Sequence, residues 1–138
     1  MKVKLENGDA NMYGYKKTVN SDYQTTVQKA REELKKEGFG VITEIDVRDT
    51  LKKKLNVEYC NYIILGACNP PFAYKALQEE KDVGLMMPCN VVVYEDKEKT
   101  IVAAALPATL LKLIGNDKLQ ETAQNIEIKL KRVIDNIT

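Results

Sequence analysis

The first forty residues change from a strand-like pattern to a helical one. Residues 12–19 mix apolar and polar side chains in the way that predicts a first strand. Ser21 and Gln24 have the spacing of a capping box, in which a hydroxyl and a residue three positions later satisfy free backbone N–H groups. Apolar residues then recur at helical spacing as far as Gly38, a residue type typical of the position after a helix.

The middle of the chain has the pattern of two strands, each followed by a helix. Residues 39–47 alternate well enough to predict a half-buried antiparallel strand, and a short helix is expected to begin at residues 49–50. Residues 62–66 are a continuous apolar run, which is typical of a central strand. Asn69 and Pro70 then suit an N-cap and a first helical residue, with the Asn69 side chain accepting an N–H of the first turn.

A hairpin is predicted next. Residues 83–95 alternate, and the charged turn after them leads into an apolar segment at 100–107. Pro88 lies inside the first of these strands and has no N–H to donate, which implies an edge position or a bulge there.

The last third of the chain is predicted to be helical, with a stop at Gly115 and a new cap at Asp117. Apolar residues of the final helix follow heptad spacing at Leu119, Ala123, Ile126, Leu130, Val133 and Ile137. We expect this narrow seam to cover one face of the sheet. The alternative is a dimer contact, because Ile128 and Ile134 lie partly off the seam.

This order of elements is strand, helix, strands, helix, hairpin and helix. It indicates one α+β domain over residues 1–138, with a mainly antiparallel sheet of about five strands and helices packed on one face.

Composition excludes several function classes. The 21 basic and 20 acidic residues give a net charge of +1, which offers no electrostatic grip on nucleic acid or anionic lipid. No window resembles a membrane span or a signal peptide, and three cysteines fit reduced thiols in the cytoplasm. The absence of histidine excludes Ser-His, Cys-His and His-zinc sites.

Two Cys-Asn pairs, Cys68-Asn69 and Cys89-Asn90, are the main chemical signal. If their strands are neighbours, the two thiols could meet at the end of the sheet and bind a soft ion such as Cu(I), or form a transient disulfide. A helix dipole just after Cys68 would also activate that thiol. The plainer interpretation is that both cysteines are small core residues, and Cys60 has no assigned role.

Several motifs together resemble a known family. They are "GFGVITEIDV", "LKKKL", "YIILGACNPPFAYKAL", "LMMPCNVVVYED" and a following "ALP", and they resemble the prokaryotic domain-of-unknown-function family 302 over about residues 13–107. The resemblance implies a TATA-binding-protein-like fold with a curved sheet, often dimeric, and it implies no established activity. The helices at 108–138 fall outside these motifs. The resemblance gives most weight to Asp46, Lys54, Gly66, Cys68, Asn69, Pro70, Pro88, Cys89 and Asn90.

The leading hypothesis is a small cytoplasmic binding domain that forms a homodimer. It would bind a small ligand or a soft metal near the two Cys-Asn pairs, with Asp46 and Lys54 added to the ligand-binding set by the resemblance. A metal would be held by Cys68 and Cys89, and no cofactor can be named. One alternative is a redox enzyme or sensor that uses Cys68. The other is an interaction module with both cysteines in its core.

Overall fold

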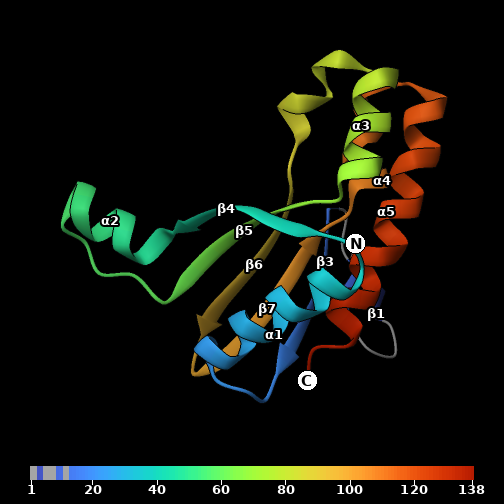
Figure 1. Ribbon diagram of the computed structural model, residues 1–138. Helices are drawn as coiled ribbons and strands as arrows, with labels where there is room; N and C mark the ends of the chain where they lie inside the picture. The colour runs from blue at the N-terminus through green and yellow to red at the C-terminus, as the bar shows by residue number, and fades with distance from the viewer. Residues whose placement is uncertain (1–2, 5–8, 11–12) are drawn as a thin grey trace.

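The protein is described by a computed structural model covering residues 3–4, 9–10 and 13–138, so Met12 of the first predicted strand lies outside the described residues. It has the expected α+β architecture, with an open antiparallel sheet and helices (Figure 1). The sheet order is β1-β2-β3-β7-β6-β5-β4, and every neighbouring pair is antiparallel. The strands are β1 (Val3–Lys4), β2 (Asp9–Ala10), β3 (Gly14–Val19), β4 (Gly40–Asp46), β5 (Tyr62–Cys68), β6 (Cys89–Asp96) and β7 (Lys99–Ala105).

Two long helices pack against one face of this sheet, α1 (Tyr23–Lys36) and α5 (Asp117–Asp135). Alternate strand residues such as Leu65, Val91 and Val102 point into the shared core and are fully buried. The shorter elements are α2 (Val47–Leu55), α3 (Pro70–Glu79), the 3-10 turn η1 (Lys81–Met86), α4 (Pro107–Leu110) and the 3-10 turn η2 (Leu111–Ile114).

All six residues of the heptad seam of α5 are buried. The later four cover the sheet as expected, and they are Ile126, Leu130, Val133 and Ile137. Leu119 and Ala123 instead pack in a second cluster with Ala76 of α3. The alternative dimer contact through Ile128 and Ile134 is wrong for Ile134, which is 0% exposed within its own chain. Ile128 is 54% exposed.

Two helix caps differ from the prediction by one residue. Asp22, not Ser21, caps α1, and its Oδ1 accepts the Thr25 N–H at 2.7 Å. The Ser21 hydroxyl lies 2.9 Å from that of Thr26 instead. Asn116, not Asp117, caps α5. Both sequences place two capping residue types side by side, so the pattern alone does not choose between them. Gly38 follows α1 with φ of 85°, as expected.

Strand β4 is exposed rather than half-buried. It lies at the edge of the sheet and pairs only with β5. A bulge between Val41 and Thr43 inserts Ile42 and breaks the alternation of side chains that the sequence suggested. Helix α2 also begins earlier than residues 49–50, at Val47, because Asp46 serves as its N-cap.

The predicted strand 83–95 begins only at Cys89, and residues 81–86 form η1 instead. Pro88 is therefore neither at an edge nor in a bulge. It comes just before β6, which lies between β5 and β7 inside the sheet. The missing N–H of Pro88 costs nothing there, because ladder pairing starts at the next residue. The hairpin of β6 and β7 is confirmed.

Candidate functional site

A cavity of about 450 Å³ lies between the ends of β5 and β6 and the helices α3, α4 and α5. Its walls are mainly apolar, with Phe72 and Ala76 from α3 and Ala123 and Ile126 from α5. Leu85 of η1 also lines it and is 87% exposed, which places this residue at the rim. The cavity is therefore enclosed by three helices and opens beside η1.

The structure brings both Cys-Asn pairs to this cavity. Cys68, Asn69, Cys89 and Asn90 all line it. Strands β5 and β6 are neighbours, with Ala67 opposite Cys89, so Cys68 lies one residue beyond the partner of Cys89. The two cysteines therefore lie on adjacent strands at the end of the sheet, as expected, but one residue out of register, so regular alternation would turn their side chains to opposite faces.

The two asparagines differ in burial although their sequence contexts match. Asn69 is 7% exposed, whereas Asn90 is open to solvent. The two Cys-Asn motifs are therefore alike in sequence, but their asparagine side chains lie in different environments.

Burial, and to a smaller extent the charge of Cys68, raise the pKa of the Cys89 thiol to about 11. A thiol held in its protonated form is a poor nucleophile, because the thiolate is the reactive species. Cys89 is thus a packing residue at neutral pH, and of the two thiols beside the cavity only Cys68 is left as a possible nucleophile.

The buried thiol predicts a pH dependence of stability. Below pH 9 the thiol is protonated in both states and its contribution is fully present. Between pH 9 and about 11 the unfolded chain ionises first, so the free energy of unfolding falls as pH rises. We expect this slope to be shallower in Cys89→Ala, by at most about 1.4 kcal/mol per pH unit.

Urea denaturation across this pH range measures both slopes. Cys60→Ala is the control, because Cys60 is exposed and its removal should leave the slope unchanged. Equal slopes in wild type and Cys89→Ala would mean that Cys89 is not buried in solution.

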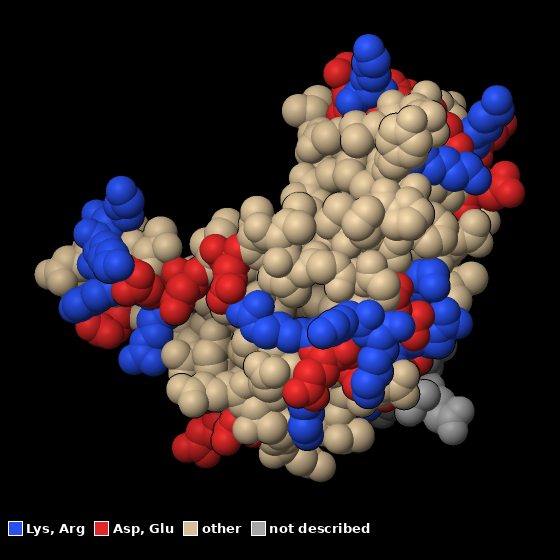
Figure 2. Space-filling view, in the orientation of Figure 1, with Lys and Arg blue, Asp and Glu red and all other residues tan. Residues whose placement is uncertain are grey.

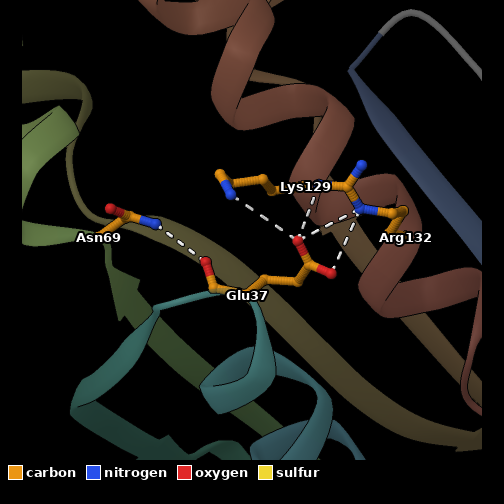
Figure 3. Close-up of polar contacts among 4 residues, drawn as sticks. All are labelled: Glu37, Asn69, Lys129 and Arg132. Atoms are coloured by element: carbon orange, nitrogen blue, oxygen red, sulfur yellow. Dashed lines mark hydrogen bonds and ion pairs between the residues drawn. The ribbon is translucent and has the colours of Figure 1, made fainter.

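Asn69 joins three parts of the fold beside the cavity. It is the N-cap of α3 by position, but its side chain makes no capping hydrogen bond, contrary to the prediction. Instead its Nδ2 donates to the backbone carbonyl of Glu37 at 3.1 Å (Figure 3). The Glu37 carboxylate in turn accepts from Arg132 Nη2 at 2.9 Å and lies 3.9 Å from Lys129 Nζ. Asn69 thereby ties the start of α3 to the end of α1, and Glu37 ties that end to α5.

Asn69→Ala should lower the free energy of unfolding by about 1–2 kcal/mol, because it leaves the part-buried Glu37 carbonyl without its donor. Thermal and urea unfolding measure this loss. Asn90→Ala is the matched control and should cost less than about 0.5 kcal/mol, since that side chain is exposed. Equal losses at the two positions would contradict a structural role specific to Asn69.

Asp46 and Lys54, the other two predicted ligand-binding residues, are not among the residues that line the cavity. Asp46 caps α2 through its Oδ1, which accepts the Asp49 N–H at 2.9 Å. Lys54 is an exposed residue of α2. Cys60 is exposed in the loop after that helix. The roles of Asp46 and Lys54 in ligand binding stay predictions.

Sequence reasoning missed the walls supplied by the end of the chain. Leu111, Leu119, Thr122 and Ala123 line the cavity, although the C-terminal helices were given no functional role. The apolar seam of α5 was visible in the sequence, but it does not show that the first turns of this helix reach past the sheet to α3.

Within the described residues, no three metal-ligating side chains form a cluster. None of the described helices is long and apolar enough to cross a bilayer.

Comparisons with known proteins agree with the fold. The family model for the domain of unknown function DUF302 matches residues 15–137, which includes the C-terminal helices. The crystal structure of an uncharacterized conserved protein DUF302 from Bacillus stearothermophilus is similar, with a TM-score of 0.87 and 31% identity. That match covers 93% of this chain and 100% of the other. No curated protein matches. The likeness to the TATA-binding protein stays a prediction.

Proposed function

Because this chain belongs to the family of the domain of unknown function DUF302, whose name assigns no ligand, we propose a function from its cavity. The protein binds a small, mainly apolar molecule between the end of the sheet and helices α3 and α5. The observation that carries this proposal is a cavity of about 450 Å³ with largely apolar walls. Ligand pockets are commonly about 300–1,000 Å³ and have the same kind of lining.

The few polar groups at the cavity favour a ligand with one polar end. Asn90 is exposed at the end of β6, and the Cys68 thiol lies on the neighbouring strand. Thr122 adds a hydroxyl on the α5 wall, although this group already donates to Glu79 Oε2 at 3.2 Å. An apolar body would fill the interior, while its polar end would face the strand ends.

The methionines at the rim support a site that accepts ligands of varied shape. Met86 and Met87 line the cavity next to Leu85, and Met86 is 38% exposed. Unbranched thioether side chains adapt to irregular surfaces more easily than branched ones. The rim therefore favours adaptable apolar contact over recognition by fixed hydrogen bonds.

Binding of the fluorescent apolar probe N-phenyl-1-naphthylamine tests the proposal. Wild-type protein should enhance its fluorescence saturably, and Ala73→Phe should reduce the affinity roughly tenfold or more by filling the cavity. Leu77→Phe is the matched control, because this residue lies on α3 but does not line the cavity and is 41% exposed. No saturable enhancement, or equal binding by wild type and Ala73→Phe, would overturn the proposal.

A soft ion held by Cys68 and Cys89 is a second candidate, favoured by the placement of both thiols at one cavity. The high pKa of Cys89 opposes it, because a metal would have to displace a firmly held proton. Copper analysis after loading the reduced protein with Cu(I) tests whether the two thiols bind this ion. Equal uptake by wild type and the Cys68→Ser/Cys89→Ser variant would exclude this site.

A thiol-based redox function remains as an alternative that rests on Cys68 alone. The rate at which iodoacetamide labels Cys68, followed against pH, tests it. A rate no faster than that of a free thiol would exclude it.

A further inference from the structure

One polar atom on the cavity wall, Asn69 Oδ1, has no hydrogen-bond partner among the described residues. Asn69 lines the cavity and is 7% exposed. Its Nδ2 donates to the Glu37 carbonyl, which can only accept, so the amide is held in one orientation and Oδ1 points away from Glu37 (Figure 3). Oδ1 is also not among the fully enclosed unpaired atoms of the described chain. A nearly buried side chain therefore leaves one acceptor open to the cavity.

The start of α3 leaves a donor in the same turn. An N-cap side chain ordinarily accepts the N–H of the third helical residue, here Phe72, but Asn69 does not. Pro70 and Pro71 have no N–H, so Phe72 has the first N–H of the helix. No described side chain accepts this N–H, and the Asn69 carbonyl is taken by the Ala73 N–H at 2.9 Å. An acceptor and a donor that usually bond to each other are both left for a ligand.

The cavity offers no charge to such a ligand. None of the described residues that line it is acidic or basic. The two cations beside Asn69 in Figure 3, Lys129 and Arg132, are both paired with the Glu37 carboxylate. Figure 2 shows cations gathered on α2 and a mostly uncharged surface over α3. An isolated charge is costly to bury in apolar surroundings, which disfavours a ligand with a carboxylate or an ammonium group.

We propose that the ligand is an uncharged apolar alcohol whose hydroxyl binds at Asn69. This inference rests on the proposed function and names the chemical class of the ligand. A hydroxyl can donate to Asn69 Oδ1 and accept from the Phe72 N–H at the same time. An ether of the same size has no donor, so its binding would leave Oδ1 buried and unpaired. A carboxylate would place negative oxygens against that acceptor.

Displacement of N-phenyl-1-naphthylamine from the wild-type protein tests this class of ligand. We expect 1-decanol to bind roughly tenfold or more tightly than its isomer 1-methoxynonane, which lacks the O–H, and than decanoate. Equal binding by the alcohol and the ether, or tighter binding by decanoate, would overturn the alcohol but leave the proposed apolar site intact. An absence of saturable probe binding would overturn both.

Two asparagine variants locate the hydroxyl contact. Asn69→Ala should abolish the preference for 1-decanol over 1-methoxynonane, because the acceptor is gone. Asn90→Ala is the matched control and should keep the preference, since Asn90 also lines the cavity but is exposed. The preference is a ratio measured within one variant, so the lower stability expected of Asn69→Ala does not enter it.

Circular dichroism shows whether each asparagine variant is folded. A preference that survives in folded Asn69→Ala, or one that is lost in folded Asn90→Ala, would overturn the contact at Asn69. If Asn69→Ala does not fold, the comparison of the three ligands on the wild-type protein decides the question.

Discussion

Gly66→Ala is expected to lower the free energy of unfolding by about 3 kcal/mol. A Cβ at this position would collide with Thr43 Oγ1 and lie 2.8 Å from Pro88 Cγ. Gly66 is on β5, which is paired with β4 on one side and β6 on the other, so its backbone cannot shift to relieve the contact. The glycine lets Pro88 approach the sheet, and Pro88 immediately precedes the Cys89-Asn90 pair at the cavity.

Urea denaturation monitored by circular dichroism measures this loss. Gly40→Ala is the matched control, since nothing lies within 4 Å of a Cβ added there, and its cost should stay within about 1 kcal/mol. Thr43→Ala in the Gly66→Ala background should recover part of the loss by removing the colliding hydroxyl. A Gly66→Ala protein as stable as Gly40→Ala would show that Pro88 does not pack on this strand.

Leu130→Ala should have a comparable effect, a loss of about 2–5 kcal/mol. Leu130 is 1% exposed and lies in the middle of the α5 seam, among the buried residues of the sheet and α1. Truncation removes its contacts and leaves a void that a packed core closes only in part.

Ile128→Ala provides the comparison, because Ile128 is two residues away on the same helix and is 54% exposed. It should cost less than about 1 kcal/mol. Denaturant midpoints of the two variants measure the difference. Similar losses would indicate that the outer side of α5 is also covered in solution.

Regular periodicity predicted α1, the β6–β7 hairpin and α5 correctly, since each of them buries a consistent side. Burial on one face requires a constant spacing, and that spacing can be read from the residues. Prediction failed where neighbours in space decide the outcome. The bulge at Ile42 and the exposure of β4 depend on its position at the sheet edge, which residues 39–47 do not encode.

The candidate site was predicted in part. Cys68 and Cys89 line one cavity because their strands are adjacent. The sequence alone did not show this adjacency, so the shared site was predicted only for the case that the two strands are neighbours. Asn69 was correctly placed at the start of a helix, but its hydrogen bond to Glu37 joins residues 32 positions apart in the chain. The residues of α5 that line the cavity are still farther along the chain from the two Cys-Asn pairs. No local sequence pattern predicts contacts between such distant segments.

The pairing of β3 with β7 has a consequence for how the chain acquires its structure. Tyr15 donates a hydrogen bond to Asp135 Oδ1, 120 residues away, and Lys17 Nζ donates to the Ile137 carbonyl. Such distant contacts must close a long loop before they contribute, which slows folding. During synthesis on the ribosome, the β7 side of β3 has no partner until β7 itself, Lys99–Ala105, has been made. The nascent protein therefore exposes a strand edge for most of its translation, a period in which chaperone binding would protect it from aggregation.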